Sequence, residues 1–433
     1  MSAVEAVLAK VAARRPRIID LSLDRVYAAL DRLGSPHANM PPVFHVAGTN
    51  GKGSTVAFIR SILEAAGKSV HVYTSPHLVR FNERIVVAGE EIADDALIDA
   101  LERCDRAVGE DKLTYFETTT CAALLAFAET PADYAVMEVG LGGRLDATNV
   151  FDKPLAAVVT PVDFDHQQFL GNTLPLIAAE KAGILRKGAP AVIGRQAPEA
   201  AAALQARAEE IGARSFVFGQ EWQVYTEHGR VIYQDEDGLC DLAPPRLPGA
   251  HQIDNAGLAV AAVRAAGLDL SDSVLSEGLA SVRWPARIQR LAKGPLVDLA
   301  RDLLGEDPEI WLDGGHNPHA GRAVASVMAD FETRRSMPLV MLSGMQANKD
   351  ARGYFEAFAG LASRLYAVAA DHSGVAPAGE VETAARAASL DARACGSLEE
   401  AMRLACTEQK NEPPRILISG SLYLAGEVLK SHA

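Results

Sequence analysis

The segment that decides the fold of this chain reads Val43-Phe44-His45-Val46-Ala47-Gly48-Thr49-Asn50-Gly51-Lys52-Gly53-Ser54-Thr55. It predicts a short strand, then a turn in which three glycines surround a lysine, and then the start of a helix. Glycines allow backbone N–H groups to converge on phosphate oxygens, and a helix N-terminus and a lysine add positive charge. We therefore predict a nucleotide-binding loop formed by Gly48, Thr49, Asn50, Gly51, Lys52, Gly53 and Ser54.

The loop departs from the common phosphate-loop pattern G-x-x-x-x-G-K-[ST] at two positions. Val46 stands where the first glycine is expected, and Gly53 separates Lys52 from Ser54. A glycine-rich turn without a ligand is the alternative interpretation. The strand before the turn and the helix after it favour nucleotide binding, with Lys52 reaching the β- and γ-phosphates.

Short β-branched segments alternate with helical, alanine-rich segments around this loop. Strands are predicted at residues 43–47, 70–74, 134–139 and 156–160, and helices at residues 54–66 and 116–129. This alternation is typical of a mostly parallel sheet with helices on both faces. Farther along, a β-hairpin is predicted where residues 222–225 and 230–233 flank the turn-prone Glu227-His228-Gly229, followed by a helix at residues 252–266.

The sequence also predicts a second domain. Pro285, Gly294 and Pro295 interrupt the alternation, which then restarts with strands at residues 310–312, 339–343, 365–369 and 416–419. We predict a first domain at residues 1–287 and a shorter α/β domain, again doubly wound, at residues 296–433.

Composition and charge limit the kind of partner. The chain has 433 residues, of which 48% are hydrophobic and 23% are charged, and its formal net charge is −14. Such a charge repels nucleic acid and anionic membranes, so we expect small-molecule substrates and neither of these partners. The five cysteines are scattered without a C-x-x-C pair, which argues against disulfides and a structural zinc site. Because the sequence has no apolar leader and no membrane-spanning stretch, we expect a cytoplasmic protein.

The segment from Gly48 to Ser54 resembles the variant phosphate loop of the Mur-type ligase superfamily. Within that superfamily the chain is most similar to folylpolyglutamate synthases and dihydrofolate synthases, which are often one bifunctional bacterial protein. The resemblance continues in the same order at residues 74–85, 138–149, 165–171, 180–184 and 313–318. Gly315 stands where this family more often has alanine.

This resemblance implies an α/β fold with a P-loop-containing Mur-ligase-like central domain and a smaller Rossmann-like C-terminal domain. It implies an ATP-dependent, ADP-forming ligase, expected to be a monomer, with its site between the two domains. Such an enzyme joins L-glutamate to dihydropteroate, to folyl-glutamates, or to both through an acyl phosphate, forming dihydrofolate and folylpolyglutamates. The alternatives are a monofunctional folylpolyglutamate synthase, another Mur-type amide ligase, and a P-loop ATPase or nucleotide-binding protein without ligase activity.

The resemblance also implies that Mg²⁺ accompanies ATP, with two ions expected. The positions that match the family's first metal site are Ser75, Glu138 and His166. Glu138 ends a predicted strand, where ligand sites of α/β proteins gather, whereas an imidazole is an unusual ligand for an ion that prefers oxygen. Lys181 would be carbamylated by CO₂ and would hold the second ion as an anionic ligand. An unmodified lysine bound to phosphate is the alternative.

The remaining site residues are assigned from the resemblance as well. Positions that match catalytic residues of the family are Lys52, Lys181 and His316, and positions that match further nucleotide contacts are Asn255, Arg287 and Asp313. The family usually has Pro-Gly-Arg at this point, and this chain has Pro285-Ala286-Arg287, so the glycine is replaced but the positively charged arginine is kept.

Two groups of residues match substrate contacts of the family. The pterin side of the acceptor would be bound by Phe116, Thr118, Asp146, Ala147 and Thr148. The incoming glutamate would be bound by His316, Lys349 and Ser421. A capping or core role is the alternative for each of these residues.

Overall fold

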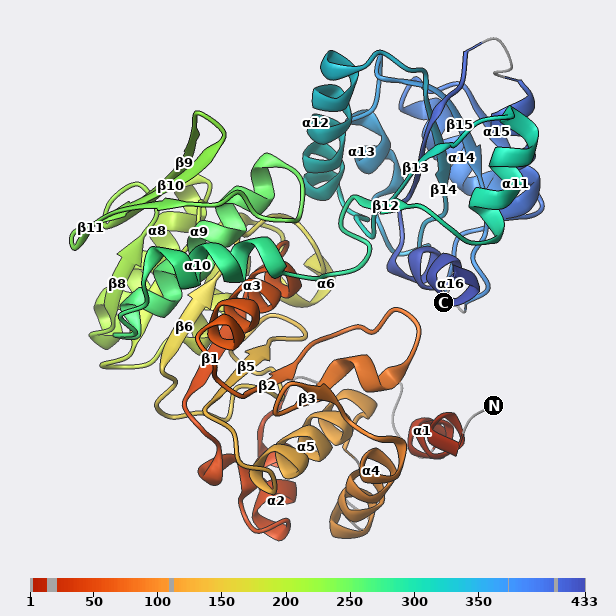
Figure 1. Cartoon of the computed structure of the whole chain (residues 1–433). Coiled ribbons are helices and arrows are strands. Elements are labelled where there is room, and N and C mark those ends of the chain that lie inside the picture. Colours follow the sequence, from red (N-terminus) through yellow and green to blue (C-terminus); the bar gives the residue numbers. More distant parts are fainter. Residues whose placement is uncertain (1–2, 14–21, 109–112, 373, 409–411, 433) are drawn as a thin grey trace. The chain divides into compact units, whose positions relative to one another are not determined.

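The computed structural model describes residues 3–13, 22–108, 113–372, 374–408 and 412–432 (Figure 1). It divides the chain into two compact units, the first formed by Met1–Arg246 and Gln252–Val282 and the second by Leu247–His251 and Arg283–Ala433. The division falls before residue 287 because the segment around Arg287 is bonded to the second unit. The N–H of Gly314 donates to the carbonyl of Ala286, and the N–H of Ile288 donates to the carboxylate of Asp313.

The first unit is built on an eight-stranded sheet with the order β4-β3-β2-β5-β1-β6-β7-β8. Its strands are β1 (Val43–Ala47), β2 (Val70–Tyr73), β3 (Ile85–Val87), β4 (Glu90–Glu91), β5 (Tyr134–Glu138), β6 (Ala156–Val159), β7 (Pro190–Ile193) and β8 (Arg214–Val217). The six neighbouring strands β2, β5, β1, β6, β7 and β8 are parallel, which confirms the mostly parallel sheet. Strands β3 and β4 pair antiparallel at its edge, which the sequence did not predict.

Helices of the first unit cover this sheet. They are α1 (Ala3–Ala13), α2 (Asp24–Arg32), α3 (Lys52–Ala65), α4 (Asp94–Val108), α5 (Tyr115–Ala128), α6 (Gln167–Leu170), α7 (Leu174–Lys181), α8 (Pro198–Ile211), α9 (Ala250–Ala265) and α10 (Asp272–Ser281). Side chains alternate across a strand, so Val43, His45 and Ala47 share one face of β1. Val43 packs in a core with α4 and α5, and Ala47 packs in a core with α7 and α8.

The predicted hairpin is confirmed and carries a third strand. β9 (Trp222–Glu227), β10 (Arg230–Asp235) and β11 (Gly238–Leu242) form an antiparallel sheet. His228 and Gly229 both have positive φ, at 49° and 78°, as the two-residue turn of a tight hairpin requires.

The second unit has a six-stranded sheet with the order β12-β13-β17-β14-β15-β16. Its strands are β12 (Gln289–Leu291), β13 (Glu309–Leu312), β14 (Leu339–Ser343), β15 (Ala362–Ala367), β16 (Ala392–Ala394) and β17 (Arg415–Ser419). Its helices are α11 (Pro295–Leu304), α12 (Pro318–Arg334), α13 (Ala351–Glu356), α14 (Ala378–Ala387), α15 (Leu398–Thr407) and α16 (Leu422–His432). All strands but β12 are parallel, as predicted, and β12 pairs antiparallel with β13.

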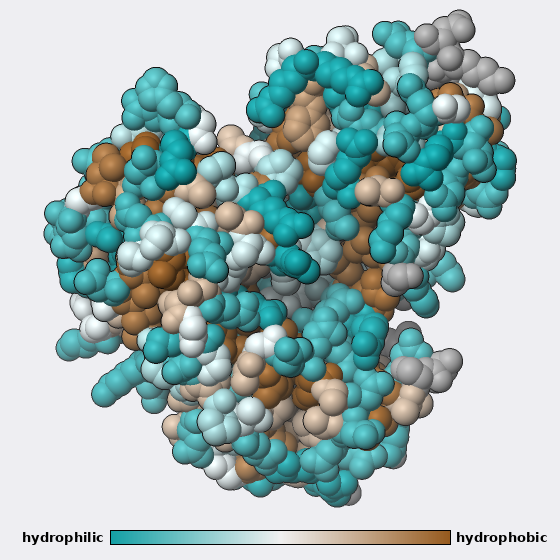
Figure 2. Space-filling model, viewed as in Figure 1, coloured by the Kyte–Doolittle hydropathy of each residue, from teal (hydrophilic) through white to brown (hydrophobic). Residues whose placement is uncertain are grey.

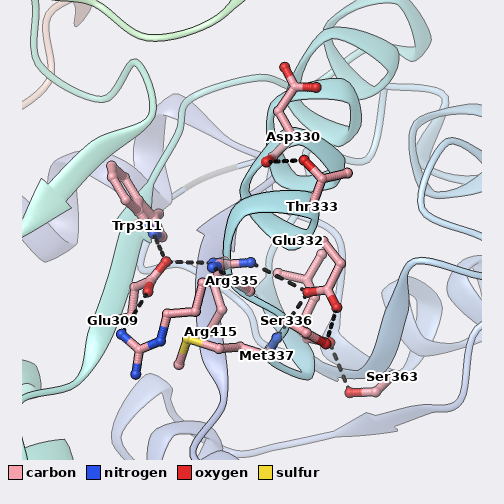
Figure 3. A network of polar contacts seen from close by, with 11 residues as sticks. Glu309, Trp311, Asp330, Glu332, Thr333, Arg335, Ser336, Met337, Ser363 and Arg415 are labelled. Carbon is pink, nitrogen blue, oxygen red and sulfur yellow. Dashed lines mark hydrogen bonds and ion pairs between the residues drawn. The ribbon is translucent and has the colours of Figure 1, made fainter.

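A buried ion pair joins the amino ends of β13 and β17 in the second unit (Figure 3). Arg415 begins β17 and donates through Nε to Glu309, the first residue of β13. The indole N–H of Trp311 donates to the same carboxylate at 3.0 Å, and Arg415 also contacts Glu332 at 3.6 Å. The strands are parallel, so this network lies at the sheet edge opposite to their carboxyl ends.

Hydrophilic residues cover most of the face in view in Figure 2, with smaller hydrophobic areas between them. Among the described residues, no helix has both the length and the apolar character needed to cross a membrane. All five cysteines are buried.

Candidate active site

The predicted phosphate loop leaves the carboxyl end of β1 and enters α3, which begins at Lys52 rather than Ser54. Gly48 has a φ of 149°, and a Cβ atom there would lie 1.8 Å from Oγ1 of Thr160. Gly51 is left-handed, with a φ of 86°, and a Cβ atom there would lie 2.5 Å from Oδ1 of Asn255. Both positions therefore require glycine, because neither the backbone nor the space accepts a side chain.

Hydrogen bonds fix the loop to the segment that follows β6. The N–H groups of Thr49 and Asn50 donate to the carbonyl of Pro161, at 2.9 and 3.3 Å. The hydroxyl of Thr49 donates to the carbonyl of Asp163 and accepts from its N–H. Nζ of Lys52 donates to the carbonyl of Thr49 at 3.2 Å, so the lysine folds over its own loop.

Helix α9 brings two amide side chains to the start of α3. Asn255, predicted as a nucleotide contact, lies against Gly51 and donates to Oε1 of Gln252 at 3.1 Å. Gln252 in turn lies 3.4 Å from the hydroxyl of Ser54. The sequence analysis missed Gln252, although a second amide three residues before Asn255 shares its helix face.

Two hydroxyls near the loop were also missed. Thr55 lies in the first turn of α3 and Thr160 follows β6, and both are fully buried. Within the described part of the chain, neither hydroxyl has a hydrogen-bond partner. Buried polar groups are rarely left unpaired, so these two atoms indicate a site built for a polar ligand.

The structure brings Ser75 and Glu138 together. Glu138 is the last residue of β5, and Ser75 follows the neighbouring strand β2. The backbone N–H of Ser75 donates to Oε2 of Glu138 at 3.3 Å. Since Glu138 pairs in register with Val46 of β1, the carboxylate stands beside the strand that leads into the phosphate loop.

The loop after Ser75 is ordered by Glu83, a residue to which the sequence analysis gave no role. Its carboxylate accepts hydrogen bonds from the N–H groups of Leu78, Val79 and Arg80, at 2.7, 2.9 and 2.7 Å. Three backbone donors on one carboxylate hold the loop in a single conformation.

Lys181 lies at the phosphate loop. It ends α7, its residue surface is only 3% exposed, and its Nζ donates to the carbonyl of Gly48 at 2.8 Å. Burial, together with the nearby positive charge of Lys52, lowers the pKa of Lys181 to about 7 despite the opposing effects of Asp165 and Asp146. A large fraction of this amine is therefore neutral near pH 7.

His166 caps the amino end of α6 in a left-handed conformation, with a φ of 51°. Its backbone N–H donates to Oδ1 of Asp165 at 2.9 Å, and its Nε2 lies 3.8 Å from the same oxygen. The side chain is 38% exposed, so the imidazole is open to solvent.

The donors near the loop suit a divalent cation that shares its ligands with a nucleotide. Among the described residues no three His, Cys, Asp or Glu side chains cluster as a complete metal site. Magnesium does not need such a cluster, because it keeps waters and uses one or two carboxylates together with substrate phosphates. Glu138 supplies a carboxylate of this kind, and Ser75, whose backbone N–H bonds that carboxylate, carries a hydroxyl, so both residue types fit that ion.

A buried carboxylate organises the predicted pterin side. Asp146 accepts at Oδ1 from the N–H and the hydroxyl of Thr148, at 3.0 and 2.6 Å, and at Oδ2 from the N–H of Leu141 at 2.8 Å. Burial raises the pKa of Asp146, while the hydrogen bonds from Thr148 and Leu141 oppose that shift. Ala147 packs in the core beside it.

The start of α5 lies over the same loop. The ring of Phe116 lies against Gly140, where a Cβ atom would lie 2.4 Å from the ring. Phe116 and Asp146 therefore border one segment, residues 140–146. Thr118 is buried and its hydroxyl donates to the carbonyl of Thr114, the residue that caps the helix.

The remaining predicted residues lie in the second unit, at the carboxyl ends of its strands. Asp313 follows β13 and accepts from the N–H groups of Ile288 and Gly315, at 3.0 and 2.7 Å. Burial raises its pKa, and the adjacent Arg287 opposes that shift. His316 Nδ1 lies 3.1 Å from the carbonyl of Gly314.

Two further predicted residues follow other strands of this sheet. Ser421 follows β17, is buried, and accepts from the N–H of Tyr423 at 3.1 Å. Lys349 lies between β14 and α13, and its N–H donates to the carbonyl of Gln346 at 3.1 Å.

Family models match both units. The model described as the Mur ligase middle domain matches residues 46–263, and the one described as the Mur ligase, glutamate ligase domain matches residues 302–422. The fold and the phosphate loop therefore define a Mur-type ligase.

Individual relatives identify the family within the Mur-type ligases. The chain is 34% identical to folylpolyglutamate synthase of Lacticaseibacillus casei, over 93% of this chain and 92% of that protein. It is similar to the structure of Escherichia coli FolC in complex with DHPP and ADP, with a TM-score of 0.88, 33% identity, and 99% and 97% of the two chains covered. The bifunctional folylpolyglutamate synthase/dihydrofolate synthase from Yersinia pestis, complexed with AMPPNP and Mn ion, gives a TM-score of 0.86, 30% identity, and 99% and 98% coverage.

The chain belongs to the dihydrofolate synthase/folylpolyglutamate synthase family, and it is an ATP-dependent ligase. The family resemblance read from the sequence is thereby confirmed.

Proposed function

We propose that this ligase accepts both dihydropteroate and folyl-glutamates, adding L-glutamate to each with ATP and magnesium. The observation that carries the proposal is the convergence on one loop of the groups that phosphoryl transfer needs. Lys181 contacts Gly48, Lys52 folds over Thr49, and Glu138 stands beside the strand that leads into the loop. The Yersinia pestis relative is described as bifunctional, which supports two acceptors.

The proposed reaction has two steps. An oxygen of the acceptor carboxylate attacks the γ-phosphorus of ATP, and ADP leaves. The glutamate amine then attacks the acyl carbon, phosphate leaves, and the amine loses a proton to form the amide. Backbone N–H groups of the phosphate loop and Lys52 hold the phosphates in line, while Ser75, Glu138 and His166 would hold a magnesium ion. Bound magnesium neutralises phosphate charge.

The roles of the other residues follow the family positions. We assign nucleotide binding to the phosphate loop with Asn255, Arg287 and Asp313. We assign the pterin end of the acceptor to Phe116, Thr118, Asp146, Ala147 and Thr148. We assign the glutamate to His316, Lys349 and Ser421.

We also propose that Lys181 becomes carbamylated and serves a second magnesium ion. Its neutral amine attacks CO₂ and loses a proton, leaving a carbamate with one negative charge and two oxygens. Burial beside Lys52 supports this step, because a buried ammonium group close to the positive charge of the half-buried Lys52 is unfavourable and the carbamate removes it.

The test is ADP release by the purified chain with dihydropteroate or tetrahydrofolate, each with and without L-glutamate, in the presence of magnesium. Glutamate-dependent release with both acceptors is the expected result. Glutamate-dependent release with tetrahydrofolate but not with dihydropteroate would indicate a monofunctional folylpolyglutamate synthase. A rate of ADP release that is the same with and without either acceptor would contradict the proposal. We expect the enzyme to be cytoplasmic and monomeric. Sedimentation of the purified chain would check the monomeric state.

A further inference from the structure

A buried histidine on the central strand is linked to the predicted acceptor site. His45 lies in the middle of β1, three residues before Gly48, and only 1% of its surface is exposed. Its Nε2 lies 2.9 Å from Oγ1 of Thr148. The hydroxyl of Thr148 donates in turn to Oδ1 of Asp146 at 2.6 Å.

The direction of these hydrogen bonds follows from the proton count. A threonine hydroxyl has one proton, and the Thr148 hydroxyl uses it in the hydrogen bond that Asp146 accepts. The hydroxyl oxygen must therefore accept from His45, so Nε2 of His45 carries a hydrogen. The chain runs His45 Nε2–H to Thr148 Oγ1–H to Asp146 Oδ1, and each bond polarises the next. Burial, with Arg186 nearby, lowers the pKa of His45 to about 3, so the ring is a neutral donor at every working pH.

This hydrogen-bond chain adds a side-chain link between the loop and β1, beside the backbone hydrogen bond from the N–H of Val139 to the carbonyl of Val46. The other hydrogen bonds to the Asp146 carboxylate come from the backbone N–H groups of Thr148, Leu141 and Gly140, which belong to the same loop as Asp146. Those bonds set the shape of the loop. His45 adds a bond from that loop to β1, the strand whose carboxyl end becomes the phosphate loop.

We propose that His45 is a positioning residue for the acceptor substrate, holding Asp146 through Thr148 at a fixed place relative to the phosphate loop. This inference rests on the proposed function, in which Asp146 binds the pterin end of the acceptor. It assigns to His45 no contact with substrate.

The experiment measures the KM for dihydropteroate and the KM for ATP in two variants of His45, in a control variant and in a double-mutant cycle. His45→Leu removes the donor to the Thr148 hydroxyl, and we expect the dihydropteroate KM to rise about tenfold, the effect of losing one buried hydrogen bond. The ATP KM should change less than about twofold, because the loop glycines and Lys52 are untouched. His45→Gln keeps an N–H donor near the position of Nε2 and should restore most of the lost affinity.

His71→Leu is the matched control. His71 is also a buried histidine on a strand of this sheet, β2, but it bonds the carbonyl of Thr130 and the N–H of Ala88. It should lose stability without a change in the dihydropteroate KM. An equal rise in that KM in His71→Leu would mean that any buried histidine loosens the site, and the proposal would be overturned.

A double-mutant cycle tests whether His45 and Thr148 act through one hydrogen-bond chain or affect the KM independently. Thr148→Val breaks the same chain at its middle, so His45→Leu should add little to the KM of Thr148→Val. Fully additive effects, or an unchanged KM in His45→Leu, would overturn the inference while leaving the proposed function intact. Should His45→Leu fail to fold, His45→Asn takes its place, because its shorter side chain keeps an amide but cannot reach Thr148: its dihydropteroate KM must rise, and that of His45→Gln must stay near the wild-type value. A wild-type protein without acceptor-dependent ADP release would instead reject the proposed function itself.

Discussion

Nζ of Lys181 lies 2.8 Å from the carbonyl oxygen of Gly48, so the last residue of α7 touches the first residue of the phosphate loop. The two residues are 133 positions apart in the chain. Lys181 is thereby held near the loop that binds phosphate, with Lys52 close enough to lower its pKa. The contact places the one residue whose chemistry is proposed to change, from a cation to an anion, at the point where phosphates would bind.

Loss of Lys52 should stop the reaction with either acceptor. We expect Lys52→Ala to lower kcat by about a hundredfold or more, because the phosphates lose a fixed positive charge in the transition state. ADP release measured with saturating acceptor and glutamate checks this. Lys68→Ala, at an exposed lysine beyond the end of α3, is the control and should behave as wild type. Near-normal turnover in Lys52→Ala would contradict the phosphate-loop assignment.

Carbamate formation on Lys181 should depend on pH in a defined direction. Only the neutral amine reacts with CO₂, and its pKa is about 7, so carbamate should increase as the pH rises from 6 to 8. The carbamate carbon can be followed by ¹³C NMR after equilibration with labelled bicarbonate. Lys181→Arg should lack the signal, because a guanidinium stays protonated. A signal that is equally strong in that variant would place the modification elsewhere.

A methyl group at Gly48 should weaken nucleotide binding. Gly48→Ala places Cβ 1.8 Å from Oγ1 of Thr160, and the loop must move to relieve the overlap. We expect ADP affinity, measured by calorimetry, to fall at least about tenfold. Adding Thr160→Ala removes the clashing oxygen and should recover part of the affinity, since the positive φ of Gly48 still opposes a side chain.

Gly67→Ala controls for the backbone effect alone. Gly67 also has a positive φ, 74°, but a Cβ atom there meets nothing within 4 Å. It should cost about 1 kcal/mol of stability and leave ADP affinity unchanged. Equal losses of affinity in Gly48→Ala and Gly67→Ala would show that the crowding at Gly48 is unimportant.

The buried ion pair of the second unit should support folding at neutral pH and fail in acid. Burial alone would raise the pKa of Glu309, but hydrogen bonds from Arg415 and Trp311 outweigh it and hold that pKa below its usual value. The pair therefore stabilises the fold above the unfolded-state pKa of a glutamate and loses this effect as pH falls through the lower, folded-state pKa. Glu309→Gln should destabilise the chain by about 3 kcal/mol at pH 7.

The measurement for Glu309→Gln is urea unfolding at several pH values. The difference from wild type should shrink as the pH falls below about 4. Glu356→Gln, in the exposed pair with Arg352, is the control and should change stability by less than about 1 kcal/mol at any pH. A constant difference between Glu309→Gln and wild type across the acid range would contradict this account.

Sequence reasoning was most successful where structure is decided locally. The strand at residues 43–47 was predicted with its observed bounds, because β-branched residues favour an extended backbone, and the turn after it was predicted because glycine accepts the positive φ found at Gly48 and Gly51. The helix after the turn begins at Lys52, ahead of the predicted Ser54, since Gly51 already caps it in a left-handed conformation. The motifs carried enough information to identify the family.

Other features depended on the order of the strands and the packing of the helices. The antiparallel strands β3, β4 and β12 are short, with three residues or fewer, and such segments have too little pattern to be read from sequence. Gln252 and Thr160 reach the phosphate loop only because α9 and the end of β6 lie beside it.

The amino-acid sequence by itself determined the phosphate loop, the α/β class and the family, because each is carried by short runs of neighbouring residues: the glycines of the turn, the alternation of strand and helix segments, and the ordered motifs. The tertiary structure alone decided that Lys181 meets Gly48 and that His45 meets Thr148, across 133 and 103 positions of the chain. No local preference encodes such contacts. They arise because the sheet places β1 between β5 and β6, and the loops and helices that follow those strands then close around the carboxyl end of β1.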